Sequence, residues 1–165
     1  MIVGTPLKRA QSLFRLAGSS VALAVQQTGF PRLAALHGGL LQAQRAVFEL
    51  LACELESVAE EATLQLGKRL SVLKNQLLLA GATNHENAIL RDLLREEETW
   101  LNQLLMCVES ADVLEVLPQH SSPGLIASSA NTTLHWAHID PTRLSSLIQQ
   151  AINYLYQVDS EQSEF

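Results

Sequence analysis

A long apolar stripe runs through the first half of the chain and restricts this region to a helix. From residue 36 to residue 77 an apolar side chain recurs every three or four positions, and no proline occurs in 32–80. Such spacing is typical of one side of an α-helix, whereas a half-buried strand requires alternation. Gly38 and Gly39 are the one weak point, because each glycine costs about 1 kcal/mol relative to alanine in a helix. We therefore predict one long helix over about 31–80. The stripe consists of Leu36, Leu40, Ala43, Val47, Leu51, Leu55, Val58, Ala62, Leu66, Leu70, Leu73 and Leu77.

A second long helix is predicted over about 84–117. Gly81 ends the first helix, and Thr83 and Glu86 have the T-x-x-E spacing of a capping box. The second helix ends before Pro118, since proline cannot continue a helix. Because the link between the two helices is short, we expect them to form a long antiparallel hairpin.

The rest of the chain adds shorter elements to this hairpin, so we predict an all-α antiparallel helical bundle that forms a single domain over 1–165. Gly29 is suited to end a helix, and Asp140 followed by proline is suited to start one. The additional elements are an amphipathic basic helix (6–28), an irregular loop (118–140), a C-terminal helix (141–158) and a polar tail (159–165).

Charge is divided unevenly along the chain. Residues 1–48 carry five basic side chains and no acidic one, whereas residues 49–165 carry six basic and 17 acidic side chains. An acidic body makes nucleic acid an improbable ligand, because binding to phosphates needs a basic surface. The chain contains two cysteines, Cys53 and Cys107, without metal-site spacing, which favours reduced thiols and a cytoplasmic location.

The first predicted helix is the strongest indication of a binding surface. It places Lys8, Arg9 and Arg15 beside an apolar side that includes Phe14 and Val21. A helix of this kind can bind a protein, or lie on a lipid or storage-granule surface. The simpler interpretation is that the apolar side covers the first half of the long helix. A targeting segment within residues 1–28 is a third interpretation, because the Leu–Ala-rich stretch follows several basic residues.

Catalytic and metal motifs are weak or missing. His120, His135, His138 and Asp140 are close in sequence and would supply zinc ligands only if the loop gathered them. The sequence contains no nucleophile elbow, phosphate loop or dinucleotide fingerprint. We therefore predict a protein without catalytic activity, cofactor or metal; an enzyme would require a site assembled entirely by the fold.

The acidic clusters have a simple interpretation as solvated helix faces. Asp92, Glu96, Glu97 and Glu98 alternate with arginines at helical spacing, as charged residues on an exposed face do. A second group consists of Glu54, Glu56, Glu60 and Glu61.

Apolar residues on a second side of the 84–117 helix suggest that another chain covers it. Leu90, Leu94, Leu101 and Leu105 flank the main apolar stripe of this helix. A helix with two apolar sides usually buries both. We therefore expect a helical protein-protein interaction or assembly protein of adaptor or chaperone-like type that self-associates; the alternative is a membrane- or granule-surface-binding protein that acts through residues 1–28.

Overall fold

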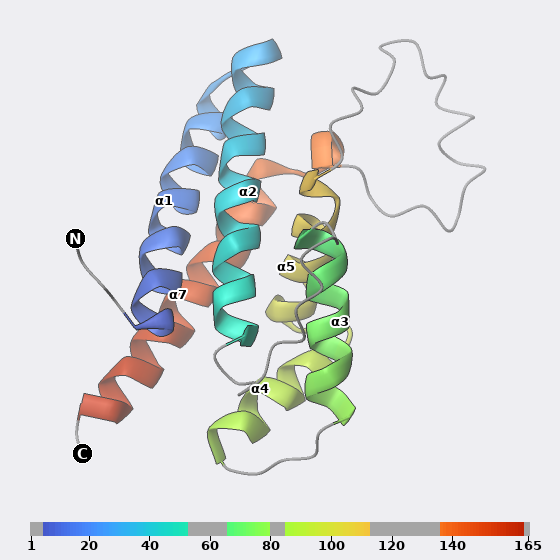
Figure 1. The fold of residues 1–165 in the computed structure, drawn as a ribbon. Helices are drawn as coiled ribbons and strands as arrows, with labels where there is room; N and C mark the ends of the chain where they lie inside the picture. The colour runs from blue at the N-terminus through green and yellow to red at the C-terminus, as the bar shows by residue number, and fades with distance from the viewer. Residues whose placement is uncertain (1–4, 53–65, 80–84, 113–135, 164–165) are drawn as a thin grey trace.

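The computed structural model describes residues 5–52, 66–79, 85–112 and 136–163, and this part of the chain is an all-α bundle without strands (Figure 1). The predicted fold class is confirmed. The helices are α1 (Pro6–Gln26), α2 (Gly29–Ala52), α3 (Leu66–Leu79), α4 (His85–Arg95), α5 (Trp100–Glu109) and α7 (Pro141–Ser163), with 3₁₀ turns η1 (Ser110–Asp112) and η2 (Trp136–His138).

Helices α1 and α2 form the most closely packed pair, an antiparallel hairpin (Figure 1). Gly29 has a φ of 63°, in the left-handed region where glycine is favoured, and this turns the chain between the two helices. Gly39 lies against α1, close to Val21 and to the backbone of Ala17. The first predicted helix therefore covers the first half of the apolar stripe, as the simpler interpretation required.

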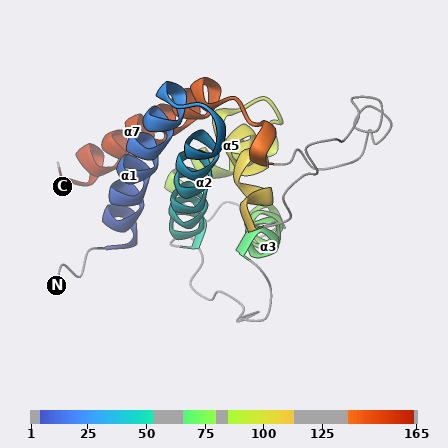
Figure 2. The ribbon, with the colours of Figure 1, turned by 90° about the horizontal axis from the view of Figure 1, so that it is seen from above.

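The prediction of one continuous helix over 31–80 is wrong. Helix α2 ends at Ala52, α3 begins at Leu66, and the two helices contact each other side by side (Figures 1 and 2). A straight helix of about 50 residues would be about 75 Å long, and most of its apolar side would remain in water. Side-by-side packing instead buries both halves of the stripe. The buried stripe residues are Leu36, Leu40, Ala43, Val47, Leu51, Leu70, Leu73 and Leu77. Leu55, Val58 and Ala62 lie outside the described residues, as does the side chain of Leu66.

The prediction of one helix over 84–117 is also wrong, because a turn at 96–99 divides it into α4 and α5. Thr99 accepts a hydrogen bond from the backbone N–H of Asn102 and so caps the start of α5. The side-chain amide of Asn102 donates to the carbonyl oxygens of Leu94 and Glu96 at 2.7 and 2.6 Å, and to that of Leu93 at 3.3 Å. These carbonyls at the end of α4 are thereby satisfied without a continuing helix. The expected capping box at Thr83 and Glu86 falls on residues whose side chains are outside the description.

Helix α5 lies at the centre and contacts α2, α3, α4 and α7. Two polar side chains of α2 bond the chain here: the buried Gln44 donates to the carbonyl of Val108 in α5 at 2.9 Å, and the partly buried His37 bonds the carbonyl of Ala111 in η1 at 2.9 Å. Helix α7 crosses behind α1 and continues to Ser163, so part of the predicted polar tail is helical (Figure 1). Its start is as predicted, because Asp140 accepts from the backbone N–H of Thr142 at 3.0 Å. Within the ranges described, no helix has the length and apolar character of a membrane span.

Candidate functional site

The predicted interaction residues of α1 lie on two opposite sides of the helix. Phe14 and Val21 are completely buried between α2 and α7, so they belong to the core. Lys8, Arg9 and Arg15 are exposed. The sequence therefore identified the basic side of α1 correctly, but the apolar residues named for binding are unavailable to a partner.

Two of the exposed arginines are held by contacts within the fold. Glu49 accepts from Arg9 and from Arg45, each at 3.3 Å, which ties α1 to α2. Arg15 lies over the ring of Tyr156 in α7, 5.3 Å from its centre. One carboxylate thus serves two guanidinium groups in the Arg9–Glu49–Arg45 cluster.

The four leucines predicted to meet another chain are also part of the core, and this corrects the sequence-based expectation. Leu90, Leu94, Leu101 and Leu105 are between 0% and 8% exposed. The turn at 96–99 allows α4 and α5 to direct this side inward, while the neighbouring Leu93 and Trp100 are only partly buried. The chain itself therefore covers the second apolar side, and the expectation of self-association no longer has its original basis.

A different apolar surface is open to solvent on the outer side of the α1–α2 hairpin. The hydroxyl of Ser20 donates to Gln42 at 3.1 Å across the line where the two helices meet. Leu16 and Leu23 lie one turn before and after Ser20 and are 53% and 55% exposed. In α2, Leu41 precedes Gln42 in the sequence and is 39% exposed, and a Cβ added at Gly38 would meet nothing within 4 Å. We call this surface the hairpin face: Leu16, Ser20, Leu23, Gly38, Leu41 and Gln42.

The charge around the hairpin face is positive. Arg9 lies two helical turns before Leu16, and Arg45 lies one turn after Leu41. Basic side chains therefore border the end of the hairpin face that is farther from the turn between α1 and α2. Arg69 of α3 extends toward the same region, 4.6 Å from the ring centre of Phe48, which Arg45 also covers at 5.2 Å. An acidic surface would therefore be attracted to this side of the molecule.

The predicted zinc ligands are only partly described. His120 and His135 lie outside the described residues, His138 is exposed in η2, and Asp140 caps α7. In the described portion of the chain, no three histidine, cysteine or acidic side chains are close enough to hold a metal ion.

Cys107 has the environment of an unreactive thiol. It is buried in α5, and burial raises its pKa to about 11, with Arg143 acting in the opposite direction. Since the thiolate is the reactive form, this side chain is protected at neutral pH. Cys53 lies outside the described residues.

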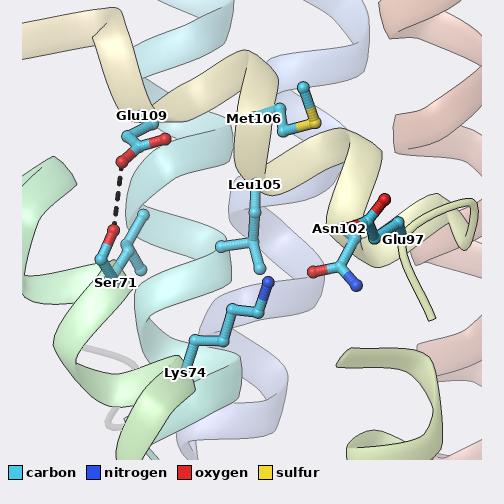
Figure 3. Close-up of a pocket in the computed structure, with 8 residues that line it drawn as sticks. Ser71, Lys74, Glu97, Asn102, Leu105, Met106 and Glu109 are labelled. Carbon is cyan, nitrogen blue, oxygen red and sulfur yellow. Dashed lines mark hydrogen bonds between the residues drawn. The ribbon is translucent and has the colours of Figure 1, made fainter. Parts of the chain in front are cut away.

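A pocket of about 340 Å³ lies between α3 and α5 (Figure 3). Ser71 donates to Glu109 at 3.1 Å and closes one end. Lys74 extends into the pocket from α3, and it has no ion pair or hydrogen bond with any described residue. The lining consists of Leu70, Ser71, Lys74, Glu97, Asn102, Leu105, Met106 and Glu109.

Asn102 gives this pocket an unsatisfied hydrogen-bond acceptor. The residue is 5% exposed, and its amide nitrogen faces the three carbonyls at the end of α4, so the side-chain oxygen must point the other way. That oxygen is buried and has no hydrogen-bond partner in the described structure. In Figure 3 it points into the pocket, toward the amino group of Lys74. A buried acceptor without a partner costs about 1–3 kcal/mol, which a donor from a ligand would recover.

Sequence patterns did not find this pocket. Asp92, Glu96, Glu97 and Glu98 are exposed as predicted, and Asp92 pairs with Arg95 at 3.7 Å, but Glu97 also lines the pocket. Asn102 could have been noticed as an amide placed among leucines three residues after a capping threonine. That Asn102 and Lys74 line the same pocket could not have been predicted, because the two residues are far apart in sequence.

Comparison with protein-family models, with characterised proteins and with solved structures finds no match for this chain. Its function must therefore be inferred from its own surfaces.

Proposed function

We propose that this protein is a non-catalytic helical interaction protein that binds an acidic amphipathic segment of another protein through the hairpin face. The observation that carries the proposal is the exposure of Leu16, Leu23 and Leu41 on one side of the α1–α2 hairpin. A bound segment would remove these side chains from water, and hydrophobic burial is the main favourable term in most protein association. Gly38 lacks a side chain at this surface, so a partner helix can approach α2 closely.

Charge favours a partner other than a second copy of this chain. Residues 1–48, which form α1 and most of α2, contain five basic side chains and no acidic one. Two copies that met through the hairpin face would bring like charges together, which opposes association. An acidic segment would instead be attracted, and its binding would weaken as salt screens the charges.

The alternative, binding to a membrane or granule surface, has less support from the structure. An interfacial helix inserts its apolar side into the lipid boundary. The apolar side of α1 is occupied, because Ala10, Phe14, Ala17 and Val21 are buried against neighbouring helices. The apolar side chains of the hairpin that remain exposed are the leucines of the hairpin face, together with Val25 and Phe30 near the turn between α1 and α2.

The test is photo-crosslinking of the full chain in extract of its native cell, with the crosslinker at Leu23 or, as control, at Leu79. Leu79 is also exposed, at 86%, but lies at the end of α3. We expect a crosslinked acidic protein from position 23 only. The double variant Leu16→Asp, Leu41→Asp should lose it while Leu79→Asp keeps it, and circular dichroism should show all variants folded. Substitutions are preferable to deleting residues 1–28, since α1 contributes to the core.

Each other outcome argues against the proposal. Equal crosslinking from both positions would indicate nonspecific contact. If position 23 gave no crosslinked product, the hairpin face would not be an interface. Co-sedimentation of the wild-type chain with vesicles containing about 30% phosphatidylserine, lost in the double variant, would support the membrane alternative. A dimer in light scattering that the double variant abolishes would identify a second copy as the occupant.

A further inference from the structure

We propose that the α3–α5 pocket binds the α-ammonium end of an apolar amino acid, either free or at the N-terminus of a peptide. The proposal is independent of the hairpin face, which lies on α1 and α2. It depends on the groups that the pocket presents at its two ends and along its floor (Figure 3).

The end formed by Asn102 and Glu97 is suited to a cationic hydrogen-bond donor. The Asn102 oxygen accepts hydrogen bonds only, and its orientation is held by the amide nitrogen on the other side of the group. Glu97 also lines the pocket and lies beside Asn102 in Figure 3, so it adds a negative charge near this end. An α-ammonium group offers several N–H donors and a positive charge at pH 7.

Lys74 makes a simple amine a poor match and an amino acid a good one. Its ammonium faces the Asn102 oxygen across the pocket in Figure 3. A bound amine alone would place two cations together. An amino acid or a peptide terminus carries a carboxylate or carbonyl oxygen next to its ammonium, and Lys74 can donate to this oxygen.

The apolar part of the pocket is suited to a side chain the size of leucine or methionine. Leu70 and Leu105 are buried in the wall, and the Met106 thioether lies at the rim, 59% exposed and free to adjust. A volume of about 340 Å³ is near the lower end of the roughly 300–1,000 Å³ usual for ligand pockets, which favours a small ligand.

The chain offers a direct reporter for this site. It contains two methionines, so labelling with ¹³C-methyl methionine gives two NMR signals: Met106 at the pocket and Met1 as an internal reference. Titration with L-leucine should move the Met106 signal saturably, with a dissociation constant of about 1 mM or below, and leave Met1 unchanged. The peptide Leu-Gly-Gly binds as well as leucine if the natural ligand is a peptide terminus, and more weakly if it is a free amino acid.

Matched controls separate recognition from nonspecific effects. N-acetyl-leucine lacks the cationic donor and should bind at least about tenfold more weakly than leucine. Lys74→Met should weaken leucine binding by a similar factor, whereas Lys68→Met, which removes an exposed lysine of the same helix outside the pocket, should not.

The proposal is overturned if neither leucine nor Leu-Gly-Gly moves the Met106 signal, or if N-acetyl-leucine binds equally well. Equal binding by the Lys74→Met and Lys68→Met variants would also overturn it. A purely structural role for Lys74, as a donor to Asn102 in the protein without ligand, would also contradict the proposal. In that case Lys74→Met will lower the thermal midpoint, and the Met106 signal will not respond to leucine in any variant.

Discussion

Gly38 and Gly39 are neighbours in α2, yet alanine at these two positions should change stability in opposite directions. At Gly38 an added Cβ would have nothing within 4 Å. At Gly39 it would lie 2.7 Å from Cγ2 of Val21, 3.2 Å from the carbonyl oxygen of Ala17 and 3.3 Å from Cβ of Ser20, where ordinary contacts begin at 3.4 Å. Rotating the Val21 side chain cannot relieve this, because Ala17 contributes backbone, so α1 and α2 would have to separate.

The size of the effect can be worked out from the difference between the two variants. Alanine gains about 0.5–1 kcal/mol over glycine within a helix, and this gain applies to both positions. Gly38→Ala should therefore stabilise the protein by that amount. Overpacking a tight contact costs about 1–3 kcal/mol, so Gly39→Ala should be destabilised by about 1 kcal/mol net. Because the helix gain cancels, the two variants should differ by about 2 kcal/mol.

Urea denaturation followed by circular dichroism measures this difference. For a slope of about 2 kcal/mol per molar urea, the midpoints of the two variants should differ by about 1 M. The slope itself should be unchanged, since the same surface is exposed on unfolding. Equal midpoints for Gly38→Ala and Gly39→Ala would refute the reasoning, because they would mean that α1 does not pack against α2 at Gly39.

Three further predictions test other parts of the structure. Asn102→Ala removes the donors to the end of α4 and should cost about 2 kcal/mol, seen as a fall of about 5 °C in the thermal midpoint. In a Cys53→Ser background, Cys107 should react with a disulfide reagent at pH 8 only as the protein unfolds. The pKa of Cys107 is about 11 in the folded protein and about 8.5 in the unfolded chain. The contribution of this thiol to the free energy of unfolding should therefore decline as pH rises between these two values. A double-mutant cycle with Arg45→Gln and Glu49→Gln should give a coupling below about 1 kcal/mol, since Arg45 is about half exposed.

Local features of the fold were predictable where one short segment contains all the determinants. Gly29 adopts the left-handed conformation expected at a helix end, and Asp140 caps α7 as its position before proline indicated. The basic side of α1 was likewise visible, because helical spacing alone separates Lys8 and Arg15 from the apolar side. Each of these features depends on neighbours within one or two helical turns.

The candidate sites were less predictable, because exposure depends on what covers a side chain. Leu90 and Leu101 have the same spacing whether a partner or the chain itself buries them. The sequence did not single out Leu16 and Leu23 as binding residues. They became candidates because α2 and α7 leave their side of α1 exposed to solvent.

By itself the sequence determined that the described part of this chain is helical and which described residues of its longest stripe avoid water, because periodicity and turn residues act locally. Only the tertiary structure decided that the stripe is divided between α2 and α3, that α4 and α5 meet at a turn, and that Asn102 and Lys74 line one pocket. The physical reason is that an apolar stripe is satisfied by any surface that excludes water, so its spacing specifies a helix without specifying its neighbour. The neighbour is selected by close packing, as at Gly39, and by polar groups that need particular partners, as at Asn102.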